Sequence, residues 1–119
     1  MNEQEFKDRT KKLALRVIKL VEALPKNQTA GIIGRQLLRS ATSVGANYRA
    51  ACRGKSSADV LHKLSIVEEE ADETLYWMEL LIESEVITAN RLVDLMSETT
   101  VSSIKTLRAK YRANPKSKI

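Results

Sequence analysis

Apolar residues recur at helical spacing along the first 24 residues of the chain. Most lysines and arginines fall on the other side of this pattern, whose apolar positions are Phe6, Leu13, Val17, Leu20 and Leu24. Asn2 followed by Glu5 has the form of a capping box, so we expect a helix to begin near Glu3. Pro25 ends it, because the residue before a proline is pushed out of the α region.

A second helix is predicted from about Thr29 to Arg53. Its core positions repeat about every 3.5 residues, the period of helical bundles, and are Ile33, Leu37, Ser40, Val44, Asn47 and Ala51. Half of these positions are small or polar, and a buried Asn47 must find hydrogen-bond partners or cost about 1 to 3 kcal/mol. The glycines inside this helix indicate close packing or a bend, and they are Gly31, Gly34 and Gly45.

The third stretch, from about Ser57 to Ser84, has the most regular heptad pattern. Gly54 is a natural stop for the preceding helix, and Ser56 or Ser57 is a natural N-cap. The pattern consists of Leu61, Leu64, Glu68, Ala71, Leu75, Met78 and Ile82. A carboxylate among core positions needs a partner, so we predict a polar layer in which Glu68 faces Arg39 or Asn47 of the second helix.

A fourth helix is predicted from Ala89 to about Tyr111, with Thr88 as its cap. Hydroxyl residues dilute its apolar stripe, which consists of Leu92, Leu95, Met96, Thr99, Ser103, Ile104, Leu107 and Tyr111. Residues 114–119 combine a proline with two lysines, which predicts a disordered basic tail after a domain of residues 1–113. Four helices with short links predict an all-α fold, an up-down-up-down antiparallel four-helix bundle.

The composition agrees with one helical domain. The 119 residues are 43% hydrophobic and 29% charged but only 4% aromatic, with four glycines and two prolines, which disfavours a sheet protein. No apolar run approaches the roughly 18 residues of a membrane span, and the charged start has no signal-peptide core, so we expect a cytoplasmic protein. One cysteine and one histidine exclude an internal disulfide and a zinc site.

Charge is unevenly distributed along the chain. Residues 1–55 hold 12 Lys and Arg against 4 Asp and Glu, residues 56–100 hold 2 against 11, and residues 101–119 hold 6 and none. The basic segments fit either a footprint for nucleic acid or pairing with the acidic middle, within the fold or between subunits. The candidate nucleic-acid-binding residues are Lys11, Lys12, Arg16, Lys19, Arg49, Arg53, Lys55, Lys105, Arg108, Lys110 and Arg112.

The sequence offers no catalytic constellation. It has no phosphate-binding glycine loop, and His62 lacks partners, which favours an exposed imidazole over a catalytic one. Arg49, Arg53 and Lys55 would lower the pKa of Cys52, but an inert interior thiol is the better interpretation. The acidic run from 68 to 73 contains no Glu-x-x-His, so a di-iron site is not expected. We predict a protein that is not an enzyme and holds neither cofactor nor metal.

The adjacent aromatic residues Tyr76 and Trp77 cannot both face the core. One of them points away from the heptad positions, which gives the third helix a second apolar face. A wide core or a subunit interface would cover this face, and we favour self-association.

The segment from Gln36 to Asn47, preceded by Leu24-Pro25-Lys26 and followed by the run from Glu70 to Trp77, resembles a known family. It is similar to the bacterial four-helix-bundle proteins named for 23S rRNA intervening sequences, over roughly residues 5–110. These proteins resemble the accessory variability determinant of diversity-generating retroelements, a basic pentamer that binds a reverse transcriptase and nucleic acid. The resemblance therefore implies a homopentamer.

Four residues fall on the family pattern and are implied to hold the polar layer, namely Gln36, Arg39, Asn47 and Glu73. Many members continue with Ile-Ala-Glu-Gly, whereas this chain has Tyr48-Arg49-Ala50-Ala51, so any role of that Glu is absent. The first functional hypothesis is a non-enzymatic oligomer that binds RNA or DNA by phosphate neutralisation, without base reading, as a reverse transcriptase accessory. The alternative is a self-associating protein-interaction scaffold whose charges serve only subunit packing.

Overall fold

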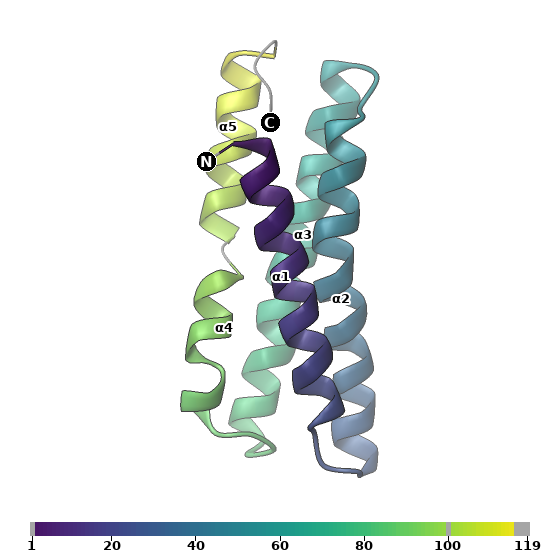
Figure 1. The fold of residues 1–119 in the computed structure, drawn as a ribbon, viewed down its shortest axis with the longest axis vertical. Coiled ribbons are helices and arrows are strands. Elements are labelled where there is room, and N and C mark those ends of the chain that lie inside the picture. The colour runs from purple at the N-terminus through teal and green to yellow at the C-terminus, as the bar shows by residue number, and fades with distance from the viewer. Residues whose placement is uncertain (1, 100, 116–119) are drawn as a thin grey trace.

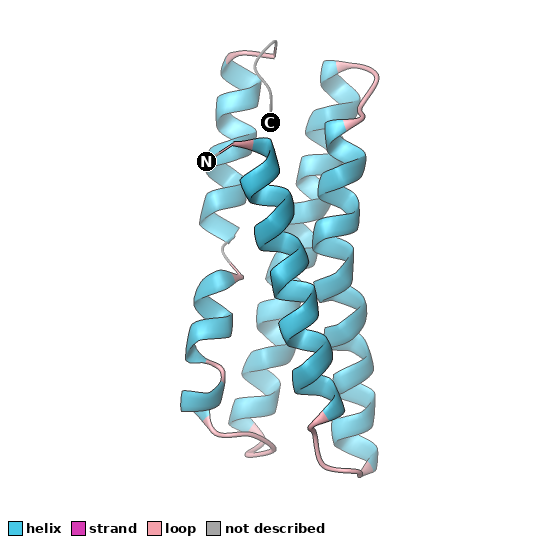
Figure 2. Ribbon diagram, in the orientation of Figure 1, coloured by secondary structure: helices cyan, strands magenta, loops and turns pink. Residues whose placement is uncertain are grey.

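The computed structural model describes residues 2–99 and 101–115, except for the side chains of residues 101–104. Its elements in chain order are α1 (Glu3–Glu22), α2 (Gln28–Cys52), α3 (Ser57–Glu83), the 3-10 helix η1 (Ala89–Arg91), α4 (Val93–Glu98) and α5 (Val101–Ala113). Figure 1 shows that α1, α2 and α3 alternate in direction and that α4 and α5 together form the fourth side. Figure 2 shows only helices and loops over the described residues. The prediction of an all-α helical bundle is confirmed.

Side-chain caps begin the three long helices. Asn2 accepts a hydrogen bond from the Glu5 backbone N–H at 2.8 Å, which confirms it as the N-cap, and its side-chain amide donates to the Glu5 carboxylate at 3.3 Å. Ser56 caps α3 by accepting from the Asp59 N–H at 3.1 Å, as predicted. Asn27 caps α2 by accepting from the Ala30 N–H at 2.9 Å, so this helix begins one residue before the predicted Thr29.

The end of α3 is a Schellman motif. The Glu85 N–H donates to the Ile82 carbonyl at 3.0 Å, and the Val86 N–H donates to the Leu81 carbonyl at 3.1 Å. Glu85 has a φ of 63°, the left-handed conformation that this motif requires and that glycine adopts at lowest cost. The chain turns here toward the fourth side of the bundle.

The core of α3 is rotated by one residue from the predicted pattern. The buried positions are Val60, Leu64, Val67, Ala71, Thr74, Met78 and Leu81. The prediction was right for Leu64, Ala71 and Met78, which the two patterns share. The other four predicted positions are only partly buried, namely Leu61, Glu68, Leu75 and Ile82. Apolar residues follow two adjacent heptad patterns on this helix because it packs against α2 on one side and α5 on the other. The spacing of the residues does not show which of the two patterns faces the centre of the core.

In α2 the buried aromatic Tyr48 takes the place expected for Asn47. The Tyr48 ring is fully buried and lies 4.5 Å from the Phe6 ring of α1, between ring centroids. Asn47 is half-buried and donates to the Ser43 carbonyl of its own helix at 2.9 Å. The predicted need for a hydrogen-bond partner at Asn47 is thus met within α2.

Close packing explains two of the glycines in α2. A Cβ atom at Gly45 would lie 3.1 Å from the Thr10 hydroxyl of α1, and one at Gly34 would lie 3.1 Å from Leu24. Both distances are tighter than ordinary van der Waals contact, so the absent side chains allow α1 to approach α2 closely.

The fourth helix is interrupted, contrary to the prediction of one helix from Ala89 to Tyr111. The interruption falls at Thr99, which is buried and whose hydroxyl donates to the Leu95 carbonyl at 2.9 Å. Thr42 and Thr74 make the same kind of bond inside continuous helices, so the break lies in the backbone of Thr99, whose ψ of 68° is outside the helical region. Thr88 precedes η1 without making a side-chain cap, so that prediction was also wrong.

Asn114 and Pro115 are exposed, whereas the rest of the predicted tail, residues 116–119, lies outside the described residues. Over the part of the chain that the structure describes, no helix has the length and apolar character needed to cross a bilayer.

Candidate nucleic-acid interface

The bundle gathers basic segments at one end of its 48 Å long axis. We divide the helices at their midpoints. The half that contains the α2–α3 loop consists of residues 2–12, 41–70 and 101–115 (Figure 1). This half holds 12 Lys and Arg against 7 Asp and Glu, a net charge of +5. The other half, residues 13–40 and 71–99, holds 6 against 8, a net charge of −2. We call them the basic half and the acidic half.

A groove of about 310 Å³ lies between α1 and α2 in the basic half. Three cations line it together with small and hydroxyl residues, and the lining consists of Lys7, Thr10, Lys11, Ala14, Thr42, Gly45, Ala46 and Arg49. Lys7 is paired with Glu3 at 3.3 Å, whereas Lys11 and Arg49 form no ion pair with any described carboxylate. Lys7 was missed in the sequence, although its spacing of four from Lys11 places both on one helix face.

Three of the predicted binding residues make ion pairs inside the bundle. Arg16 lies 2.7 Å and Lys12 3.9 Å from the Glu98 carboxylate of α4. Arg108 of α5 lies 2.9 Å from the Glu68 carboxylate and donates to the Ser65 hydroxyl at 3.1 Å. These contacts tie the fourth side of the bundle to α1 and α3. Lys12 is exposed in spite of this contact. The other predicted cations are exposed as well, namely Lys11, Lys19, Arg49, Arg53, Lys55, Lys105, Lys110 and Arg112.

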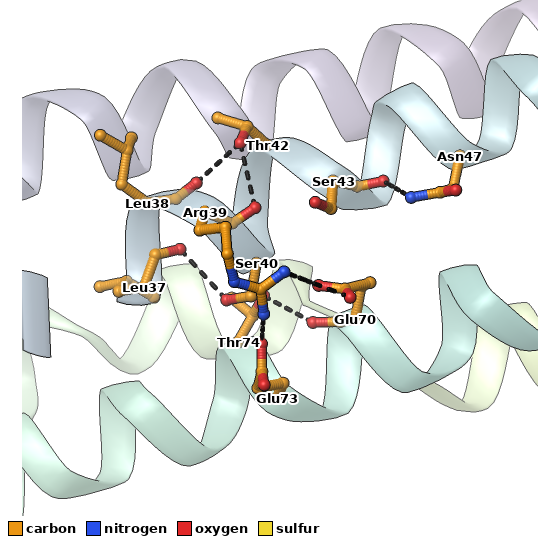
Figure 3. A network of polar contacts seen from close by, with 10 residues as sticks. All are labelled: Leu37, Leu38, Arg39, Ser40, Thr42, Ser43, Asn47, Glu70, Glu73 and Thr74. Atoms are coloured by element: carbon orange, nitrogen blue, oxygen red, sulfur yellow. Dashed lines mark hydrogen bonds and ion pairs between the residues drawn. The ribbon is translucent and has the colours of Figure 1, made fainter. Parts of the chain in front are cut away.

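A polar network joins α2 to α3 near the middle of the bundle (Figure 3). The Thr74 hydroxyl lies 3.0 Å from the Ser40 hydroxyl and 2.8 Å from the Glu70 carbonyl, and Ser40 donates to the Leu37 carbonyl at 3.2 Å. Both hydroxyl side chains are fully buried. Every buried hydroxyl here has a partner, so the layer costs little in desolvation.

The Arg39 guanidinium covers the outer side of this layer. It donates to the Glu70 carboxylate at 3.2 Å and to the Glu73 carboxylate, one cation between two anions (Figure 3). The expected pairing of Arg39 with Glu68 was therefore wrong, because the fourth side supplies Arg108 to Glu68 instead. Two of the residues that the family pattern implies for the layer, Arg39 and Glu73, contact each other. Gln36, a third, is exposed.

Burial, not the neighbouring cations, dominates the titration of Cys52. Desolvation raises the pKa of its thiol above the ordinary value, which agrees with the interpretation of an inert thiol. Burial likewise raises the pKa of the adjacent Tyr48 phenol. His62 is exposed, and no group of three metal-ligating side chains occurs over residues 2–99 and 105–115.

The exposed aromatic is Tyr76, which lies in the acidic half. Its side chain is 51% exposed and its ring meets the half-buried Trp77 ring edge to face, with centroids 5.1 Å apart. The prediction that one of this pair points away from the core was right. Ile32 of α2, Leu15 of α1 and Val93 of α4 are the other large exposed apolar residues among the described side chains.

Fold and surface thus define an all-α bundle with a satisfied hydroxyl layer between α2 and α3 and two halves that differ in charge. The family model of the 23S rRNA-intervening sequence protein matches residues 2–107, and the chain belongs to this family. A solved structure is also similar, a protein of unknown function from the S23 ribosomal protein family of Bacteroides thetaiotaomicron. It is 35% identical, with a TM-score of 0.82 over 96% of this chain and 100% of the other. A comparison with curated proteins gives no match.

Proposed function

We propose that this protein is a non-enzymatic, oligomeric bundle that binds RNA or DNA through its basic half. The observation that carries the proposal is the groove between α1 and α2, where Lys11 and Arg49 face solvent without a described carboxylate partner. A lysine or arginine that binds a phosphate releases a counterion from the nucleic acid, and a cation without an ion-pair partner does so without first breaking an ion pair. Arg53 and Lys55 continue the exposed positive charge at the end of α2 and into the loop.

Self-association is a second part of the proposal. The exposed apolar side chains of Tyr76 and Ile32 lie on neighbouring helices, and their burial between copies would remove them from water. A pentamer, and an accessory role beside a reverse transcriptase, are supported by the resemblance to the accessory variability determinant. Repetition of the basic half in each copy would multiply the number of phosphate contacts.

The test compares two triple variants with equal change of charge. K11E/R49E/R53E reverses exposed cations in the basic half, and K26E/R35E/R91E reverses exposed cations in the acidic half. Binding of labelled duplex DNA and of a structured RNA is followed by fluorescence anisotropy between about 50 and 200 mM salt. Loss of three phosphate contacts would reduce the slope of log affinity against log salt by about 2.7 for duplex DNA.

We expect the first variant to show this reduction in slope and to lose most of its affinity, with unchanged helicity by circular dichroism. The control variant should keep at least most of the wild-type slope. Equal losses in both variants would show general charge attraction and contradict the groove assignment. Weak wild-type binding even at the lowest salt would contradict nucleic-acid binding and favour the interaction scaffold. The ion pairs that Arg16 and Arg108 form inside the bundle support this alternative.

A further inference from the structure

The placement of the aromatic residues bears on which form of nucleic acid the basic half accepts. The chain has one Phe, three Tyr and one Trp, and all five lie among the described residues. Proteins that hold single strands combine a basic groove with exposed aromatic rings on which unpaired bases stack. A site without such rings can contact the backbone alone.

In the basic half every aromatic ring belongs to the core. Phe6, Tyr48 and Tyr111 are 6%, 0% and 8% exposed, and the first two rings pack against each other. The groove is lined instead by lysine, arginine, threonine, alanine and glycine. These side chains offer charge and hydroxyl groups to phosphates but no surface for a base.

The exposed aromatic ring, that of Tyr76, lies among carboxylates, which repel the phosphates of a nucleic acid. Tyr76 belongs to the acidic half, and its neighbours on the same side of α3 are Asp72, Glu73 and Glu79, four, three and three residues away in the sequence. A strand stacked on Tyr76 would bring its phosphates close to these carboxylates. The ring and the basic groove therefore do not form one single-strand site.

The exposed cations of the basic half come from three helices. Lys11 belongs to α1, Arg49 to α2, and Lys105 and Lys110 to α5, in a molecule about 22 Å across. All three helices reach this end of the bundle (Figure 1), where α1 packs against α2 and α5 packs against α3. Charge spread over several helices suits phosphates on two strands, because a duplex carries one negative charge per about 1.7 Å of its axis.

We infer that the basic half binds double-stranded nucleic acid by its phosphate backbone and discriminates against single strands, an inference that rests on the proposed function. Discrimination arises because a single strand has the lower charge density and releases fewer counterions per contact, with slopes of about 0.7 against 0.9 per phosphate. The base stacking that compensates for this difference in single-strand proteins has no ring to use in the basic half.

The test uses probes with matched numbers of phosphates. A duplex of roughly 16 base pairs and an unpaired mixed-pyrimidine strand of roughly 32 nucleotides are titrated at about 100 mM salt, for DNA and RNA separately. We expect the duplex to bind at least about ten-fold more tightly, and K11E/R49E/R53E to weaken both probes. Equal or tighter binding of the single strand would overturn this inference and leave the proposed function standing. Absence of binding to either probe at about 50 mM salt would overturn both.

A second variant tests the role of the exposed ring directly. Y76A removes the exposed aromatic side chain, and a stacking contribution would appear as a loss of about five-fold or more in single-strand affinity. We expect both affinities to stay within two-fold of wild type. A selective loss of single-strand affinity would show that Tyr76 stacks with bases and would contradict the separation of ring and groove.

Discussion

The ion pair between Glu68 of α3 and Arg108 of α5 allows a quantitative test of how the fourth side is held. The pair joins the Arg108 guanidinium to the Glu68 Oε2 atom at 2.9 Å, and the two side chains are 26% and 17% exposed. Glu68 Oε2 is buried and accepts no well-aligned hydrogen bond, so Arg108 supplies its compensation as a charge. Removal of Arg108 would leave a buried carboxylate oxygen without a counter-charge.

The expected size of the effect follows from the distance and the burial. Attraction at this separation amounts to about 6 kcal/mol at an effective dielectric constant near 20, and most of it is offset by desolvation of the two groups. Exposed pairs contribute about 0 to 1 kcal/mol and hydrogen bonds to charged groups about 1.5 to 3 kcal/mol. For this partly buried pair we expect a coupling energy of about 1 to 2 kcal/mol.

The assay is a double-mutant cycle of E68Q, R108Q and E68Q/R108Q, with the free energy of unfolding measured in urea by circular dichroism. R108Q should be the more damaging single change, because Arg108 freed by E68Q can turn to water, whereas the Oε2 atom freed by R108Q is buried. The double variant should lose less than the sum of the single losses. Additivity within about 0.3 kcal/mol would refute the coupling. A binding titration of R108Q adds a check on function, because a structural Arg108 predicts an unchanged salt slope.

Two further predictions concern α3, one at its contact with α2 and one at its C-terminal turn. S40A and T74V each remove one of the two buried hydroxyls, and their cycle should show a coupling of about 0.5 to 1.5 kcal/mol in urea unfolding, because the hydroxyls lie 3.0 Å apart; zero coupling would mean that each hydroxyl is satisfied by its own helix. E85G should raise the unfolding free energy by about 0.5 to 1 kcal/mol, because Glu85 holds a φ of 63° that costs a non-glycine residue energy. An unchanged or lower melting temperature of E85G would contradict this account of the Schellman motif.

The positions of the three long helices and the starts of α1 and α3 are local properties, and they could be read from the sequence. Asn2 and Ser56 cap the helices they were expected to cap, since a cap depends on residues within one turn. The all-α bundle follows in the same way from helical periodicity and scarce aromatic residues. The interruption at Thr99 was missed because the apolar pattern of the sequence continues at helical spacing across it.

The pairing of charges depends on which helices meet, and only the tertiary structure decides that. Sequence periodicity placed Glu68 at a polar layer but assigned it a partner on α2, whereas α5 supplies Arg108 and Arg39 turns to Glu70 and Glu73. Any of these cations satisfies a carboxylate equally well by charge, so spacing along one helix does not choose among them. The choice follows from the rotation of α3 between its neighbours.

The same distinction applies to the candidate interface. The sequence determines that the first half and the end of the chain are basic and that the aromatic residues are few. The antiparallel packing of the helices determines that these basic segments meet at one end, with Lys11 beside Arg49 across a groove. It also buries Phe6, Tyr48 and Tyr111 and leaves Tyr76 in the acidic half. Charge adds along a sequence, but a binding surface forms only where folding brings distant charges together without a partner.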